Sequence, residues 1–199
     1  MDSRDKIVRV AFNLFLQKGY KEVSLREIVD KVGLTKGAFY HYFTGKEKLF
    51  REVVDLFVIS GGDQVYDGIP RNNLKEFMIG YLERVTAFID QVQRELNASE
   101  RKIGVNYFSL TFDALRILPG FAEEINKMHQ KERQTWMEVI ANARKAEEIS
   151  THLSDQQLAK MFIGVNDGIG MHLISEGRVE EVTGEVFTLW NGMYNLIKT

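Results

Sequence analysis

Apolar residues recur at three- and four-residue intervals along almost the whole chain, which is the spacing that places side chains on one face of an α-helix. Ile7, Val10 and Leu14 begin the first stripe of this kind. Alternating apolar and polar runs rich in β-branched residues, which favour strands, are scarce. The pattern therefore predicts an all-α fold.

Four short helices are predicted near the N-terminus. They cover about residues 3–18, 24–33, 35–43 and 44–59. The second and fourth begin with the Ser/Thr-x-x-Glu pattern of a capping box, from Ser24 to Glu27 and from Thr44 to Glu47. Thr35 is the expected N-cap of the third.

The rest of the chain predicts longer helices. They cover about 73–94, 103–117, 120–147, 155–176 and 179–197. We expect two domains, 1–51 and 52–199, which we call the head and the body. The head holds 11 Lys+Arg and 6 Asp+Glu, a net charge of +5, and the body has a net charge of −7. A basic head indicates a polyanionic partner, although random variation of surface charge is the alternative.

Two of the short helices meet at a turn that contains Gly33, as in a helix-turn-helix whose second helix enters the major groove of DNA. Phe39 and Phe43 are four residues apart and are expected to pack inward. The opposite face of this helix carries Lys36, Gly37, Tyr40 and His41. A cation, a phenol and an imidazole on an outward face can contact bases and phosphates, and a glycine allows close approach of the backbone.

Phosphates are also bound by helix N-termini, where free N–H groups and the helix dipole attract anions. Ser24, Thr35 and Lys46 lie at three predicted helix starts. Ser24 and Thr35 are expected to cap their helices as well. The alternative for Lys46 is a solvated lysine, and the alternative for Tyr40 and His41 is partial burial against neighbouring helices.

At these residues the chain resembles the DNA-binding domain of the TetR (tetracycline-repressor) family of transcription regulators. The resemblance covers about residues 5–51, through the runs AFNLFLQKGY, VSLREIVDKVGLTKGAFYHYF and GKEKLF. It implies an all-α homodimer with an N-terminal three-helix, helix-turn-helix DNA-binding domain and a C-terminal helical domain for ligand binding and dimerisation. It further implies DNA contacts by Ser24, Thr35, Lys36, Gly37, Tyr40, His41, Tyr42 and Lys46. The family often has Tyr-His or His-His where this chain has His41-Tyr42, which leaves the roles of these two residues open.

The last two predicted helices carry long apolar stripes. Such faces either pair with a second copy as a four-helix bundle or are buried within the same subunit. The resemblance favours the dimer interface. Its candidate residues are Phe162, Val165, Ile169, Val186, Leu189, Trp190 and Met193.

The middle of the body is rich in aromatic residues, with a few polar ones among them, which is typical either of a small-ligand pocket or of plain hydrophobic core. The resemblance favours a pocket for a small effector. Its candidate residues are Asn106, Tyr107, Phe108, Phe112, His129, Trp136, Asn166, Met171 and His172.

Catalytic chemistry is not indicated by the sequence. There is no cysteine, and the four histidines have neither an HExxH motif nor i,i+4 spacing, so we expect no metal site, no cofactor and no enzyme activity. The charged first residues lack the apolar run of a signal peptide, and no apolar run is long enough for a membrane span, which predicts a cytoplasmic protein.

Together with the resemblance, these features predict a ligand-responsive transcriptional regulator that binds specific DNA sequences. We expect a repressor that a small hydrophobic or amphipathic effector releases from a palindromic double-stranded operator. One alternative is an architectural DNA-binding protein with the same head. Another is an enzyme with an accessory head, against which the missing catalytic motifs argue.

Overall fold

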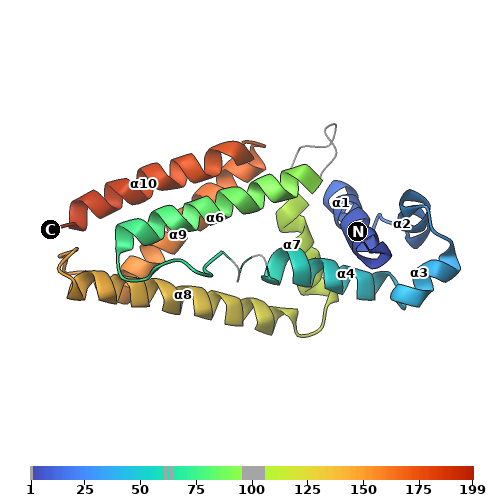
Figure 1. Cartoon of the computed structure of the whole chain (residues 1–199), viewed down its shortest axis with the longest axis horizontal. Helices are drawn as coiled ribbons and strands as arrows, with labels where there is room; N and C mark the ends of the chain where they lie inside the picture. The colour runs from blue at the N-terminus through green and yellow to red at the C-terminus, as the bar shows by residue number, and fades with distance from the viewer. Residues whose placement is uncertain (1, 61, 63–64, 96–105) are drawn as a thin grey trace. The chain divides into compact units, whose positions relative to one another are not determined.

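The computed structural model describes residues 2–60, 62, 65–95 and 106–199, and within these ranges it is helical with no strand; the side chains at 92, 95, 106 and 107 are outside the described part. The helices are α1 (Ser3–Lys18), α2 (Leu25–Val32), α3 (Lys36–Tyr42), α4 (Lys46–Val54), η1 (Asp55–Ile59), α6 (Leu74–Glu95), α7 (Asn106–Ile117), α8 (Phe121–Lys145), α9 (Asp155–Ser175), η2 (Val179–Glu181) and α10 (Val182–Ile197) (Figure 1). The all-α prediction is confirmed. The predicted start of α7 at residues 103–105 lies outside the described residues.

The helices α2 and α3 begin where their capping residues predicted. Ser24 Oγ accepts a hydrogen bond from the Glu27 N–H at 3.1 Å, and Thr35 Oγ1 accepts one from the Ala38 N–H at 3.1 Å. The turn between α2 and α3 is closed by Gly33 in the left-handed region, at φ 79°, where a residue without Cβ is favoured. Local sequence therefore determines both the break and the restart that make the helix-turn-helix.

The fourth helix differs from its prediction at both ends. Gly45, not Thr44, is its N-cap, and no side chain caps it. Regular α-helix ends at Val54 and continues as the π-helical turn η1 (Asp55–Ile59), where Phe57 and Val58 remain buried. A π-helical turn shifts the register of the side chains that follow it, which apolar spacing alone did not predict.

Unit 1, comprising Met1–Gly62 and Val92–Ile125, is one of two compact units of the chain. Its centre is α1, which packs against α2, α4 and α7. Phe12 stacks on Phe57 with ring centroids 3.8 Å apart, and Phe15 meets the edge of Phe50 at 5.2 Å. Unit 1 therefore contains the predicted head together with a helix from the body, and the division of roles between 1–51 and 52–199 stays a prediction.

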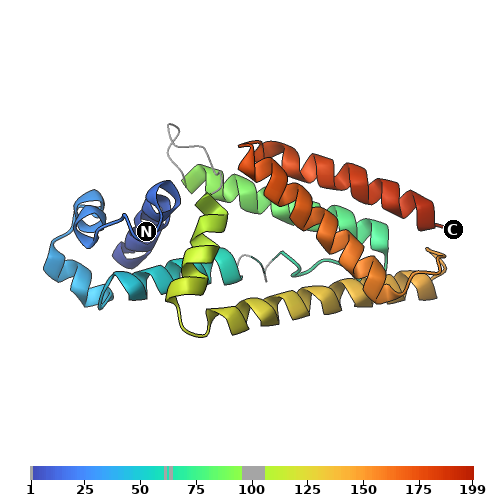
Figure 2. The same cartoon turned by 180° about the vertical axis from the view of Figure 1, so that it is seen from behind.

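Unit 2 comprises Asp63–Gln91 and Asn126–Thr199. In it α9 and α10 lie side by side, as both views show (Figures 1 and 2). Trp136 stacks on Phe162 at 5.2 Å, and Trp190 Nε1 donates to the Phe162 carbonyl at 2.8 Å. Both indoles are almost completely buried, so the aromatic side chains of three helices form the core of this unit.

Candidate nucleic-acid interface

The two faces of α3 separate as the helical spacing predicted. Phe39 and Phe43 are 1% and 4% exposed, whereas Tyr40 is 47% exposed although it is a large aromatic residue. Lys36 and His41 are exposed on the same outward side. Partial burial of Tyr40 and His41 against neighbouring helices is therefore not what this structure shows.

The outward face of α3 combines positive charge with aromatic surface. The Lys36 ammonium lies 5.9 Å from the centre of the Tyr40 ring, and the ring of His41 meets the edge of the half-buried Tyr42 ring at 5.1 Å. A Cβ placed on Gly37 would meet nothing closer than Thr35 Oγ1 at 4.0 Å. Packing inside the chain therefore does not require glycine at position 37, and the open space there is available to a partner.

Ser24 and Thr35 remain exposed although their hydroxyls cap helices. A hydroxyl that accepts one hydrogen bond still has a proton to donate. Each can therefore cap its helix and donate to a phosphate oxygen at the same N-terminus.

Lys46 is half-buried and is not the solvated lysine of the alternative drawn from the sequence. Its Nζ donates to the carbonyls of Tyr20 and Val23, at 2.8 Å each, and lies 4.1 Å from the centre of the Tyr20 ring. Burial lowers the pKa of the Lys46 ammonium. Two of its three N–H donors are thus used inside the head, so Lys46 first of all ties the α1–α2 turn to the start of α4.

The candidate effector residues are divided between the two units. Phe108 and Phe112 belong to unit 1, where Phe112 is 51% exposed. The side chains of Asn106 and Tyr107 lie outside the described residues. In unit 2, Trp136 belongs to the hydrophobic core.

Three further effector candidates lie at the surface of unit 2. Met171 is 51% exposed, His129 is exposed, and His172 is exposed with its Nε2 3.2 Å from Glu176 Oε1. Exposure of these side chains places them outside any enclosed cavity of the unit. Only Trp136 and Asn166 among the unit 2 candidates reach its interior or the edge of it.

Asn166 belongs to a polar group at the edge of the aromatic core of unit 2. We call Tyr66, Tyr81, Glu132 and Asn166 the phenol cluster. Tyr66 Oη donates to Glu132 Oε1 at 2.6 Å, and Asn166 Nδ2 donates to Tyr81 Oη at 3.2 Å. The two phenol rings are 5.3 Å apart, and Tyr81 is 6.1 Å from Trp136.

The electrostatic balance of the phenol cluster disfavours negative charge. Burial raises the pKa of the Glu132 carboxyl, and the neighbouring Asp167 carboxylate adds to the rise, although the Tyr66 hydrogen bond opposes it. Burial also raises the pKa of both phenols. An incoming positive charge would be attracted to such a carboxylate, and the ring faces would add cation–π attraction.

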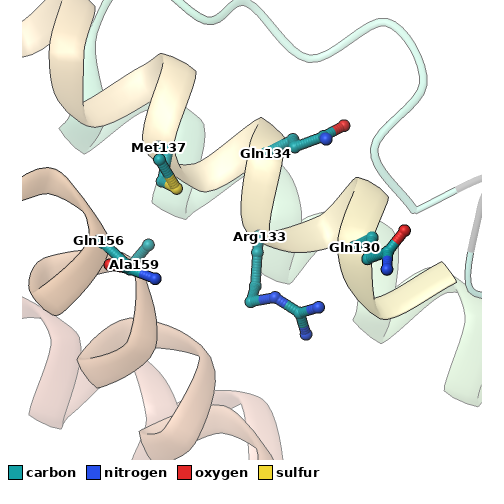
Figure 3. A pocket seen from close by; sticks show the side chains of 6 residues that line it. All are labelled: Gln130, Arg133, Gln134, Met137, Gln156 and Ala159. Atoms are coloured by element: carbon teal, nitrogen blue, oxygen red, sulfur yellow. The ribbon is translucent and has the colours of Figure 1, made fainter. Parts of the chain in front are cut away.

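A separate hollow lies between α8 and α9 in unit 2. Figure 3 shows its lining, which comprises Gln130, Arg133, Gln134, Met137, Gln156 and Ala159. Its volume is about 260 Å³, which is at the small end for ligand sites. None of the candidate effector residues belongs to this lining.

The dimer prediction needs a correction at three positions. Phe162, Val186 and Trp190 are all 0% exposed. Their side chains pack into the core of their own unit, because the apolar stripes of α9 and α10 face α6 and α8 rather than solvent. They cannot form the surface of an interface.

Other positions of α9 and α10 do leave apolar surface exposed. Leu189 is 42% exposed, and Val165, Ile169 and Met193 are half-buried. Met161 and Phe187, at 44% and 38%, were missed by the sequence reasoning. They lie on the sides of the helices that the apolar stripe does not cover.

The residues of the phenol cluster other than Asn166 were also missed. Tyr66, Tyr81 and Glu132 come from three segments far apart in the chain, and no spacing in the sequence links them. Asp113 of α7 was missed as well, although it is the only acidic residue in an apolar run from 106 to 117. A single acid inside an apolar helix is a signal that could have been followed.

In the part of the chain that the structure describes, no group of three or more His, Cys, Asp or Glu side chains is arranged so that it could hold a metal ion. Among the described helices, none combines the length and the apolar character that crossing a bilayer requires.

Comparison with known proteins adds a family to this geometry. Residues 7–53 match the family model of bacterial regulatory proteins, tetR family. The chain is 35% identical over 88 residues to the HTH-type transcriptional regulator AcrR of Shigella flexneri, covering 41% of each chain. It is 51% identical over 43 residues to the transposon Tn10 TetC protein of Escherichia coli, covering 22% of each. These matches span less than half the length of the curated relatives.

Solved structures extend the likeness from the head to the whole fold. A putative transcriptional regulator from Saccharomonospora viridis, in complex with choline, superposes with a TM-score of 0.69 at 17% identity, covering 98% of this chain and 97% of that one. The reduced form of NemR from E. coli gives a TM-score of 0.62 at 15% identity, covering 96% and 97%. Residues 7–53 thus match the tetR family of bacterial regulatory proteins, and beyond them the likeness to solved structures is one of fold.

Proposed function

We propose that the chain is a transcriptional regulator that binds a specific operator in double-stranded DNA through the outward face of α3. The observation that carries this proposal is the exposed Lys36, Tyr40 and His41 beside the buried Phe39 and Phe43. A helix of this kind offers base contacts from its side chains while the caps of α2 and α3 meet phosphates. The proposed contacts are Ser24, Thr35, Lys36, Gly37, Tyr40, His41 and Tyr42, with Lys46 contributing its remaining N–H.

The regulator acts as a homodimer in this proposal. Exposed apolar side chains of α9 and α10, including Leu189, Met161 and Phe187, give a surface on which a second copy can pack. A two-fold dimer presents two α3 helices to successive major grooves, which requires a palindromic operator. Sedimentation equilibrium tests the assembly, and a chain that stays monomeric at micromolar concentration would contradict it.

DNA recognition is tested by selecting duplexes from a random library and measuring affinity by mobility shift, with random DNA as competitor. Removing Lys36 or Tyr40 by substitution with alanine should weaken the selected complex by about tenfold, or about 1.4 kcal/mol. Lys145→Ala, an exposed lysine of α8, is the matched control and should bind as the wild type does. Equal affinity for selected and random DNA would instead support the architectural alternative.

The proposed effector site is the phenol cluster with Trp136, which lies at the edge of the core of unit 2. A half-buried carboxyl beside two phenols and an indole suits an amphipathic molecule with a positive charge. The choline complex of the Saccharomonospora viridis regulator supports a small cationic ligand for this fold. Such a ligand would favour a conformation with lower operator affinity, so that the protein acts as a repressor.

The effector proposal can be tested through intrinsic fluorescence, because both tryptophans of the chain lie near the cluster: Tyr81 is 6.1 Å from Trp136 and 5.4 Å from Trp190. Choline, tetraphenylphosphonium and tetraphenylborate are the probes, the last two being of similar shape and opposite charge. The cations should change the tryptophan emission. Glu132→Gln should weaken their binding about tenfold, or about 1.4 kcal/mol. Glu138→Gln, exposed on the same helix and paired with Arg71, should not. A response to tetraphenylborate equal to that of the phosphonium would reject a cationic effector.

A further inference from the structure

Asp113 of α7 is a carboxylate in an unusual place. It is 9% exposed, and among the side chains that the structure describes only Asp113 and Thr135 are both polar and buried. A carboxylate taken out of water is costly unless hydrogen bonds compensate for its lost hydration. A side chain kept there is therefore expected to have a role that an apolar residue could not fill.

The Asp113 carboxylate is bonded to the turn between α1 and α2. Its Oδ2 accepts a hydrogen bond from the Tyr20 backbone N–H at 3.1 Å. Gly19, directly before Tyr20, has φ 78°, and a Cβ there would lie 3.7 Å from the same carboxylate oxygen. The left-handed glycine ends α1 and directs the Tyr20 N–H toward α7.

The same turn is bonded on its other side to the start of α4. The carbonyls of Tyr20 and Val23 accept from Lys46 Nζ, and the Tyr20 ring lies 4.5 Å from the Phe50 ring. Lys46 is the first residue of α4 and follows α3 after only three residues. Asp113, Tyr20 and Lys46 thus form a continuous series of contacts from α7 to the start of α4, three residues after α3 ends.

Two electrostatic effects act on the Asp113 carboxylate in opposite directions. The carboxylate of Asp113 lies beside the C-terminal end of α1, where the helix dipole is negative and disfavours an anion. The hydrogen bond from Tyr20 is charge-assisted and opposes that repulsion. Because the two effects oppose each other, the contact depends on the hydrogen bond between Asp113 and the Tyr20 N–H.

We propose that Asp113 is a positioning residue: by holding the α1–α2 turn, and through it the start of α4, it sets the orientation of α3. This inference rests on the proposed DNA-binding function. In a dimer, the orientation of α3 determines which spacing of the two operator half-sites fits. Asp113 therefore controls the preferred spacing, and it does so without contacting DNA.

The test compares Asp113→Leu, which removes the acceptor at similar volume, with Asp113→Asn, which keeps an acceptor oxygen. Operators are first selected with the wild type. Affinity is then measured by fluorescence anisotropy for the selected operator, for versions with one base pair inserted or deleted between half-sites, and for random DNA. Hydrogen exchange at the Tyr20 amide reports the contact itself. Glu123→Gln, an exposed carboxylate in the same unit, is the matched control.

We expect Asp113→Leu to lose about tenfold in affinity for the selected operator, which corresponds to about 1.4 kcal/mol, and to lose its preference among the three spacings. Binding to random DNA at low salt should stay within about twofold, because phosphate contacts dominate it. Exchange at Tyr20 should accelerate in Asp113→Leu. Asp113→Asn should restore protection and spacing preference, and Glu123→Gln should change neither.

Unchanged spacing preference in Asp113→Leu would overturn the inference, and so would an equal loss on operator and random DNA, which indicates a purely structural role. If that variant does not fold, Asp113→Glu replaces it, since the extra methylene displaces the acceptor and must alter the spacing preference. A wild type that selects no palindromic operator would instead reject the proposed function, which separates the two failures.

Discussion

The head and the last two helices of the body both show apolar stripes in the sequence, but the stripes mean different things. In α3 the stripe is narrow, so Phe39 and Phe43 point inward and the remaining face is free for a partner. In α9 and α10 the stripe is broad, and Phe162, Val186 and Trp190 are buried in the core of their own unit. A stripe therefore identifies the buried side of a helix, and the residues beside it identify the surface available for binding.

The largest expected effect comes from breaking the body at a residue that sequence reasoning assigned to the surface. Trp190→Ala removes a fully buried indole and its hydrogen bond to the Phe162 carbonyl. The free energy of unfolding should fall by about 3–5 kcal/mol, as measured by urea denaturation. If Trp190→Ala weakened only dimerisation and left the free energy of unfolding unchanged, Trp190 would belong to the dimer interface instead.

Two neighbours in α3 sharpen the comparison within the head. Phe39→Ala should lower the free energy of unfolding by about 3 kcal/mol, because it empties a buried site. Tyr40→Ala should change it by no more than about 0.5 kcal/mol, since the side chain is exposed. Operator affinity, measured without denaturant on folded protein, should fall more for Tyr40→Ala than for Phe39→Ala. Equal destabilisation by the two substitutions would mean that α3 has no free face.

The pH dependence of stability separates the phenol cluster from ordinary surface acids. Because burial raises the pKa of the Glu132 carboxyl in the folded protein, the folded state binds its proton more tightly than the unfolded state does. The resulting stability is complete below the unfolded pKa and is lost as pH rises through the folded one. Urea midpoints of the wild type should therefore drift downward from about pH 4.5 toward neutrality, relative to Glu132→Gln. Identical profiles for wild type and Glu132→Gln, with Glu138→Gln as control, would show that Glu132 is solvated.

Much of the head could be predicted residue by residue. Ser24, Thr35 and Gly33 act through bonds or backbone angles within a few residues of themselves, so their neighbours in the sequence contain the necessary information. The prediction that Thr44 caps the fourth helix was wrong. The pattern of a capping box was present, but Gly45 took the cap position and Lys46 turned to the carbonyls of Tyr20 and Val23.

By itself the sequence determined the all-α class, the position of α3 as the second helix of the helix-turn-helix, and the inward and outward faces of that helix. These depend on periodicity and on capping, which operate over one or two helical turns. Only the tertiary structure decided that Asp113 meets Tyr20, that Tyr66 meets Glu132, and that Trp190 belongs to the core. Each of these contacts joins segments far apart in the chain, and which helices become neighbours depends on packing of the whole unit rather than on any local pattern.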